Sequence, residues 1–207
     1  MGVSGVGVSG VGVTGVGVTG PVGIFGGVFN PPHDGHVALA REAIDYFGFS
    51  RLLVRVVANP GHKKVDTPPQ TRLALTVLAF AALDQADVSL DPFGRTVDSL
   101  EALGVADSVF LIGADELAAF PTWTRPDRVL ELTRIGAATR PGTDVFALES
   151  LIAALSRPDR IELFPIAPRP VSSSQVRDRV AAGLPVDTLV PASVAAEIER
   201  LCLYRKT

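Results

Sequence analysis

Short apolar runs alternate with helical patterns along the chain after Pro21, and this alternation limits the fold more than any other feature. The unbroken Leu/Val run at 52–58 is typical of a strand buried on both faces of a parallel sheet. Strands are predicted at 22–29, 52–58, 88–90, 109–112, 135–138 and 160–164. Helices are predicted at 35–47, 70–83, 97–103, 127–132, 145–155, 174–182 and 192–201, with a short one before 121. Repeated strand–helix units join parallel strands by right-handed crossovers, so we expect an α/β fold. It would be Rossmann-like and doubly wound, with a mostly parallel sheet and helices on both faces.

Length and composition set the broad class of the protein. The 207 residues fit a single domain, and a hydrophobic content of 47% is enough for a sizeable core. The net charge of −3 removes any general electrostatic reason to expect nucleic acid as a partner. Cys202 is the only cysteine, which excludes a disulfide framework and suits a reducing cytoplasm. No apolar run approaches the ~18 residues of a spanning helix, and the start does not resemble a signal peptide. We expect a cytoplasmic protein with no membrane partner; a homo-oligomer stays open.

A Gly/Val repeat occupies the first part of the chain. Residues 2–21 form four five-residue units and contain eight of the 20 glycines. Ordering so much glycine costs more backbone entropy than valine burial returns, so 1–21 is predicted to be a mobile, low-complexity segment before a domain at 22–207. Gly5-x-Gly7-x-x-Gly10 matches a dinucleotide-binding fingerprint, but the repeat itself generates it and no helix pattern follows. An NAD-dependent oxidoreductase is therefore disfavoured.

The first strand ends in glycines, prolines and histidines. Gly26 and Gly27 allow a backbone to approach a ligand closely, and the helix that starts near Gly35 points free N–H groups at the same place. His33 and His36 lie across this turn and can donate to phosphate oxygens. A tight turn with two surface histidines is the alternative. Because two of the three histidines lie beside paired glycines, we favour an anion site.

The last predicted pair of helices begins with a run of hydroxyl residues. Ser172 and Gln175 have the spacing of a capping box, which by itself explains the run as a capped helix start. Exposed N–H groups at a helix start also bind phosphate, and Arg177 adds positive charge. Both interpretations use the same N–H groups.

These two segments resemble the two signatures of the nucleotidyltransferase superfamily. The first likeness is Gly26-Gly27-x-Phe29 followed by His33-x-Gly35-His36, and the second is Val171–Arg177. Segments between them resemble the bacterial nicotinic acid mononucleotide adenylyltransferases, over residues 22–205 in all. The segments are 95–100, 111–115, 120–123, 139–142, 189–191 and 203–204. The resemblance implies transfer of AMP from ATP to nicotinic acid mononucleotide, giving nicotinic acid adenine dinucleotide and pyrophosphate. It also implies Mg²⁺ that arrives with ATP, and no metal held by the protein alone.

The resemblance assigns roles by position. The catalytic residues would be His33, His36 and Arg177. The ATP-binding residues would be Gly26, Gly27, Phe29, His33, His36, Gly113, Asp115, Ser173, Ser174 and Arg177. The residues on the pyridine-nucleotide side would be Lys63, Thr96, Trp123, Thr124 and Arg140. From the residues alone, Trp123 could be a core residue, Thr96 a helix N-cap, and Lys63 a solvated charge beside His62.

Two positions depart from the family pattern. Asn30 stands where the bacterial enzymes usually have Asp, and Arg95 stands where they usually have Tyr. Two alternative functions therefore stay open. The acceptor could be nicotinamide mononucleotide or another phosphate compound. The protein could also be a catalytically weakened homologue that binds nucleotide.

Overall fold

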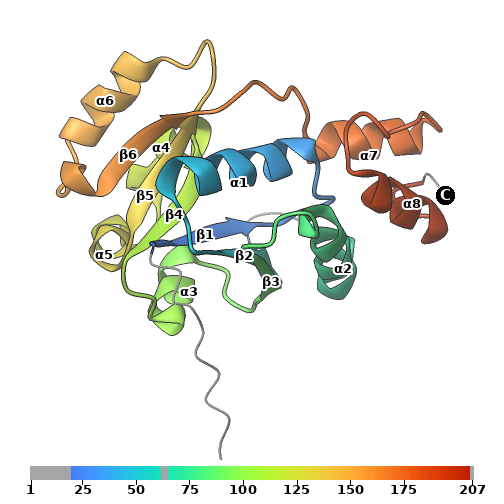
Figure 1. Ribbon diagram of the computed structural model, residues 1–207, viewed down its shortest axis with the longest axis horizontal. Helices are drawn as coiled ribbons and strands as arrows, with labels where there is room; N and C mark the ends of the chain where they lie inside the picture. Colours follow the sequence, from blue (N-terminus) through green and yellow to red (C-terminus); the bar gives the residue numbers. More distant parts are fainter. Residues whose placement is uncertain (1–19, 62–64, 206–207) are drawn as a thin grey trace, which may run out of the picture.

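The computed structural model describes residues 20–61 and 65–205, so the predicted mobile segment at 1–21 lies almost wholly outside the described residues, as does Lys63. Six strands form one sheet, in which every pairing is parallel (Figure 1). They are β1 Val22–Gly27, β2 Arg51–Val57, β3 Ala86–Asp91, β4 Ser108–Gly113, β5 Arg134–Thr139 and β6 Ile161–Pro165. The predicted α/β fold is confirmed, and its sheet is fully parallel rather than mostly so.

In residues 20–61 and 65–205, eight α-helices and two 3₁₀ turns connect and follow these strands. The helices are α1 Asp34–Phe47, α2 Pro69–Phe80, α3 Thr96–Leu103, α4 Ala114–Ala119, α5 Pro126–Leu132, α6 Val145–Ala153, α7 Ser173–Ala181 and α8 Ala192–Arg200. The 3₁₀ turns are η1 Phe120–Thr122 and η2 Pro158–Arg160. Each predicted helix is present within about three residues of its expected bounds. None of the helices among the described residues is long and apolar enough to cross a membrane.

The strand order is β3-β2-β1-β4-β5-β6. The chain adds β2 and β3 on one side of β1 and then adds β4, β5 and β6 on the other side, so the order of the strands reverses between β1 and β4. Ligands of open parallel sheets bind beyond the carboxyl ends of the strands at such a reversal. The loop that begins at Val28 and the helix α4 that begins at Ala114 leave the sheet at this point. The fold therefore brings the first predicted motif, after β1, close to the segment after β4.

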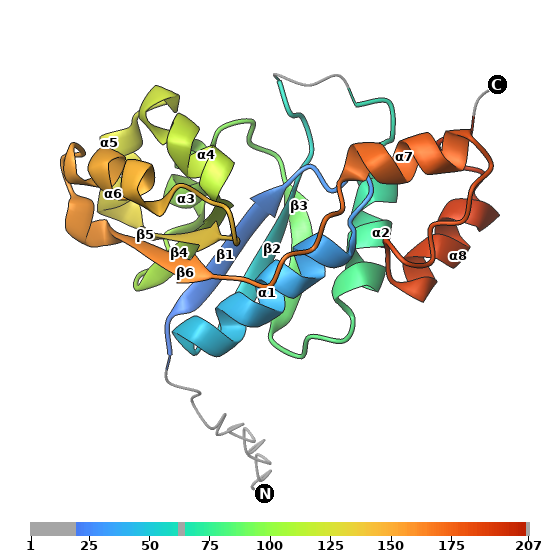
Figure 2. The ribbon, with the colours of Figure 1, turned by 90° about the horizontal axis from the view of Figure 1, so that it is seen from above.

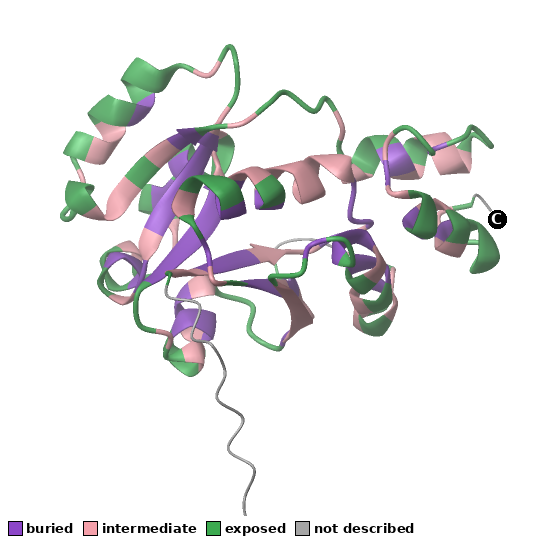
Figure 3. Ribbon diagram, in the orientation of Figure 1, coloured by how far each residue is buried: buried purple, intermediate pink, exposed green. Residues whose placement is uncertain are grey.

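The sheet separates two hydrophobic cores. The first core packs α1, α2, α7 and α8 on one face, with Ala40, Leu75, Val176 and Val194 among its buried residues. The second core packs α3, α4, α5 and α6 on the other face, with Val97, Leu117, Leu130 and Leu148 among its buried residues. Figure 2 shows α7 and α8 beside α2, far from α5 and α6. Figure 3 shows the buried residues gathered in the central strands and on parts of the helices, while the edge strands β3 and β6 are mostly intermediate or exposed.

Arg72 is a buried cation that ties three segments together. It is 1% exposed, and its guanidinium donates to the carbonyl oxygens of Val28, Val57, Ala58 and Thr67 at 2.7–3.2 Å. Burial lowers the pKa of the Arg72 guanidinium. Val28 and Val57 lie at the ends of neighbouring strands, so Arg72 holds the ends of β1 and β2 against α2.

Candidate functional site

The two histidines meet at the start of α1. His33 precedes the helix as its N-cap, and His36 is its third residue. Their rings stack with centroids 3.7 Å apart, and the backbone N–H of His33 donates to Nδ1 of His36 at 3.2 Å. Because Nδ1 of His36 accepts this bond, Nε2 carries the proton in the neutral ring. The Phe29 ring packs on His36 at 5.0 Å and fixes its orientation.

Burial keeps both imidazoles neutral. His33 is 8% exposed, and burial lowers its pKa to about 4. Burial lowers the pKa of His36 well below its usual value, and the neighbouring His33 lowers it further. Nδ1 of His33 is buried with no hydrogen-bond partner among the described residues. Protonation of either ring is unfavourable while the rings are buried and stacked. A polyphosphate beside them would offset the positive charge of a protonated ring.

The lowered pKa of His33 predicts a loss of stability in mild acid. The unfolded chain takes up a proton near the usual pKa of 6.5, and the folded chain does so only near 4. Lower pH therefore favours the unfolded state, at a cost of up to about 3 kcal/mol for a gap of roughly 2.5 units. Urea unfolding at pH 6.5, 5 and 4 should show wild type losing more stability than His33→Gln. Parallel losses in the two proteins would contradict the assignment.

The start of α7 contacts the same turn from a point about 140 residues later. Ser172 accepts from the backbone N–H of Gln175 at 3.1 Å and so caps the helix. The Ser173 hydroxyl donates to the carbonyl of Pro31 at 2.8 Å. Arg177 donates to the carbonyl of Asn30 at 2.6 Å and to the Ser174 hydroxyl at 3.1 Å. The structure thus brings the two predicted signatures together.

Asn30 has a second partner that the sequence did not reveal. The hydroxyl of Tyr204 donates to Oδ1 of Asn30 at 2.9 Å. Burial raises the pKa of Tyr204, so this hydroxyl keeps its proton near neutral pH. The neutral amide at position 30 is therefore held by a hydroxyl from the other end of the chain.

Both predicted glycines of the first motif lie against aromatic rings. A Cβ on Gly27 would lie 2.8 Å from the Phe29 ring, and a Cβ on Gly26 would lie 3.3 Å from the Phe110 ring. Phe29 itself has φ of 48° and is 2% exposed, so its ring is fixed on the sheet. A side chain at position 27 would displace this ring from the histidines.

Asp115 and Arg140 lie together at the ends of β4 and β5. Both are exposed, and the guanidinium of Arg140 lies 4.0 Å from the carboxylate of Asp115. They line an open pocket of about 570 Å³, which also includes residues of α6 and the segment 168–170. Arg140, predicted for the pyridine nucleotide, thus lies beside Asp115, predicted for ATP. Neither role is tested by these contacts, so both stay predictions.

Trp123 and Thr96 lie on the face of the second core. Trp123 is partly exposed and meets Phe110 and Phe120 nearly edge-on, with centroids 6.2 and 5.3 Å away. It therefore packs on the core and still offers surface to a ligand, while Thr124 is exposed. Thr96 is the first residue of α3, and Arg95 occupies the N-cap position, so the N-cap interpretation of Thr96 is wrong.

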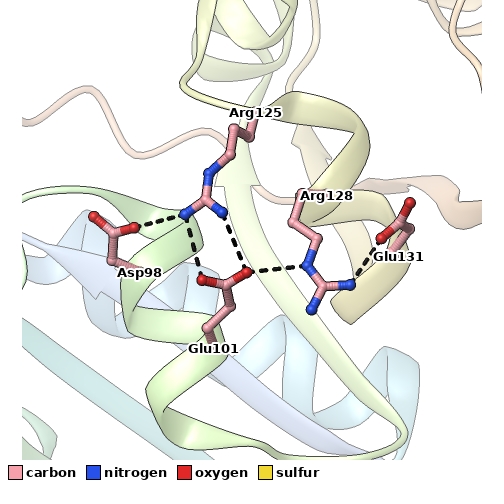
Figure 4. A network of polar contacts seen from close by, with 5 residues as sticks. All are labelled: Asp98, Glu101, Arg125, Arg128 and Glu131. Atoms are coloured by element: carbon pink, nitrogen blue, oxygen red, sulfur yellow. Dashed lines mark hydrogen bonds and ion pairs between the residues drawn. The ribbon is translucent and has the colours of Figure 1, made fainter.

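A network of charges joins the segments that carry Trp123 and Thr96 (Figure 4). Arg125 has φ of 52°, and its guanidinium contacts Asp98 at 2.8 Å and Glu101 at 3.3 Å. Arg128 contacts Glu101 at 3.0 Å and Glu131 at 2.8 Å. Each exposed pair contributes little alone, but the shared contacts fix the start of α5 against α3. The sequence did not predict this network, since three of its four pairs join residues 24 to 27 positions apart.

Comparisons with known proteins agree with this geometry. A model of the cytidylyltransferase-like family matches residues 24–179. A probable nicotinate-nucleotide adenylyltransferase of Thermomicrobium roseum is 37% identical, with 89% of this chain and 91% of the relative covered. One of Roseiflexus sp. is 35% identical, with 89% and 98% covered. The chain belongs to the nicotinate-nucleotide adenylyltransferase family. The resemblance predicted from the two signatures is confirmed.

Solved structures of this adenylyltransferase family share the fold. The nicotinic acid mononucleotide adenylyltransferase of Plasmodium falciparum, complexed with NaAD, aligns with a TM-score of 0.73 at 15% identity and covers 90% of this chain and 98% of its own. A putative nicotinate-nucleotide adenylyltransferase from Vibrio parahaemolyticus aligns with a TM-score of 0.62 at 18% identity, covering 91% and 98%. At these identities the likeness concerns the fold.

Proposed function

We propose that the protein transfers AMP from ATP to nicotinic acid mononucleotide, releasing pyrophosphate and forming nicotinic acid adenine dinucleotide. The observation that carries the proposal is the stacked His33–His36 pair, joined to the start of α7 in a chain of this family. The reaction would take place in the cytoplasm, where the exposed thiol of Cys202 stays reduced.

The proposed reaction needs aligned donors rather than a covalent nucleophile. An oxygen of the acceptor phosphate attacks the α-phosphorus of ATP, and the bond from that phosphorus to the pyrophosphate oxygen breaks. Nε2–H of His36 can donate to a phosphate oxygen, because its Nδ1 is already engaged by the backbone. His33 and the N–H groups at the start of α7 add donors on the same side of the turn. These groups orient the triphosphate and stabilise the charge that develops on it.

Mg²⁺ is part of the proposal as a companion of ATP. The described residues contain no group of three or more His, Cys, Asp or Glu side chains that could hold an ion. The proposed ion would take its ligands mainly from the phosphates, as is usual for Mg²⁺ with nucleotides. When bound, the ion supplies positive charge to the leaving pyrophosphate.

A pyrophosphate-release assay tests this function. The protein is incubated with ATP and Mg²⁺, together with nicotinic acid mononucleotide, nicotinamide mononucleotide or no acceptor. Pyrophosphate release that requires a mononucleotide supports the proposal. ATP binding without release would instead favour the catalytically weakened homologue suggested by Asn30.

The acceptor pocket is expected to prefer nicotinic acid mononucleotide. Backbone N–H groups near Thr124 can donate to a carboxylate, but they would face the NH₂ donor of an amide. One such mismatch predicts a preference of at least ~10-fold in kcat/KM. Trp123→Ala should weaken both mononucleotides and leave the affinity for ATP nearly unchanged, because its indole offers a face to any pyridine ring. Equal use of the two acceptors would reject the selectivity. An unaffected Trp123→Ala enzyme would make this residue part of the core only.

A further inference from the structure

Arg55 is a partly buried arginine in the middle of the sheet. It lies on β2, and its Nη1 donates to the hydroxyl of Ser89 on the neighbouring β3 at 2.6 Å. Its Nε is buried with no hydrogen-bond partner among the described residues. Burying a guanidinium is costly unless its charge and N–H groups are matched. Among the described residues, the Arg55 guanidinium therefore has a neutral acceptor for Nη1 and no acceptor for Nε.

No carboxylate of the described residues forms an ion pair with Arg55, although other arginines of the chain have such partners. Two acidic residues of β3 share a face with Ser89, Asp87 two residues before it and Asp91 two residues after it. Asp87 pairs with Arg51. Asp91 is 4% exposed, and its Oδ1 accepts from the backbone N–H of Phe93 at 3.0 Å. A neutral hydroxyl thus holds the Arg55 guanidinium, and its charge has no anionic partner among the described residues.

Arg55 lies on the face of the sheet that carries Trp123. Leu53, two residues earlier on β2, belongs to the second core, and side chains two apart on a strand share a face. Trp123 packs against this core through Phe110. The phosphate-binding candidates lie on the opposite face, since Phe25 and Phe29 of the first core contact His36. Arg55 is therefore on the aromatic side rather than the phosphate side of β1.

One strand, β1, lies between Arg55 on β2 and the aromatic ring of Phe110 on β4. Gly26 pairs in register with Arg55 and carries no side chain. Outside its chain neighbours, only the Phe110 ring lies within 4 Å of the point where a Gly26 side chain would begin, among the described residues. The row across the sheet is thus a cation on β2, a glycine on β1 and an aromatic ring on β4.

We propose that Arg55 determines acceptor specificity by binding the carboxylate of the pyridine ring. The inference rests on the proposed function and assigns to this chain a cationic partner for the acceptor, in addition to backbone N–H groups. A guanidinium matches a carboxylate with charge and with two parallel N–H donors, and a carboxamide has neither the charge nor the second acceptor. The carboxylate of the ring would point to Arg55, and the face of the ring would lie against Trp123.

The test compares Arg55→Leu with wild type on the two mononucleotides. The variant should lose at least ~10-fold in kcat/KM for nicotinic acid mononucleotide, and change less than ~3-fold for nicotinamide mononucleotide, because only the carboxylate contact is removed. The KM for ATP should not change. Arg55→Lys keeps the charge but loses the planar guanidinium. Its kcat/KM for nicotinic acid mononucleotide should therefore lie between those of wild type and Arg55→Leu. Arg51→Leu is the matched control, since Arg51 lies on the same strand at its other end and pairs with Asp87.

Each outcome of this test either supports or overturns the binding of the acceptor carboxylate by Arg55. Equal losses for both mononucleotides would mean that Arg55 binds the phosphate that they share, and would overturn the proposal. Unchanged kinetics in Arg55→Leu would also overturn it.

Calorimetric titration of each mononucleotide separates this inference from the proposed function. Binding selectivity that disappears in Arg55→Leu supports the inference even if no pyrophosphate is released. Turnover with intact selectivity in Arg55→Leu contradicts the inference and leaves the function standing.

Discussion

Replacing His36 with alanine is expected to lower kcat by about 10²-fold or more, since the loss of one preorganised donor to a developing negative charge costs about that much. The ring of His36 is fixed by a backbone N–H, by the stacked His33 and by Phe29. Its free Nε2–H therefore points in one fixed direction. The expected effect falls on turnover, because the donor matters most when charge builds up on the phosphates. Steady-state kinetics of pyrophosphate release measure it, and His33→Ala should behave similarly.

Arg41→Ala provides a control for this prediction. Arg41 lies on the same helix α1 and is exposed, so its loss should leave kcat within a few-fold of wild type. Circular dichroism of His36→Ala should match that of the native protein. If the fold is native and turnover stays close to wild type, the histidine pair does not bind the reacting phosphates.

Replacing Arg72 with methionine is expected to lower the free energy of unfolding by about 3 kcal/mol or more, because buried acceptors left without a donor cost about 1–3 kcal/mol each. Four carbonyl oxygens receive hydrogen bonds from this one guanidinium. Methionine fills much of the volume but has no N–H group. Urea unfolding of the two proteins measures the difference.

The same substitution should also reduce activity. Val28 is the residue before Phe29, and its carbonyl is one of the four that Arg72 holds. Loss of this contact loosens the turn that positions the histidines. Arg51→Met removes an exposed, ion-paired arginine from β2 and is the matched control, with an expected change of less than about 1 kcal/mol. An Arg72→Met protein as stable as wild type would show that solvent or rearrangement satisfies these carbonyls.

The elements of the fold could be predicted because their apolar periods are strong. The run at 52–58 became β2 within one residue at each end, since buried parallel strands are apolar throughout. The edge strand β3 was predicted too short, at 88–90 instead of Ala86–Asp91. Five of its six residues are only partly buried, so its pattern is weaker.

The contacts that complete the site could be predicted only in part. His33, His36 and Arg177 could be predicted as site residues because they lie in short motifs. Arg55 and Arg72 carry no such signal. The partner of Arg55 is a hydroxyl on a neighbouring strand, and those of Arg72 are backbone carbonyls at the ends of β1 and β2 and before α2. Their importance depends on strand register, which a single sequence does not specify.

The bond between Tyr204 and Asn30 has a consequence for the order in which the protein is made. A chain is synthesised from its N-terminus, and early segments can begin to fold while later ones are still inside the ribosome. The turn at residue 30 emerges early, but the hydroxyl that holds its amide and the arginine that holds its carbonyl come 174 and 147 residues later. The nascent chain can therefore assemble most of its sheet before the turn at Asn30 has these two hydrogen-bond partners. If this turn binds phosphate as proposed, tight nucleotide binding is expected only after residues 177 and 204 have been synthesised and have folded.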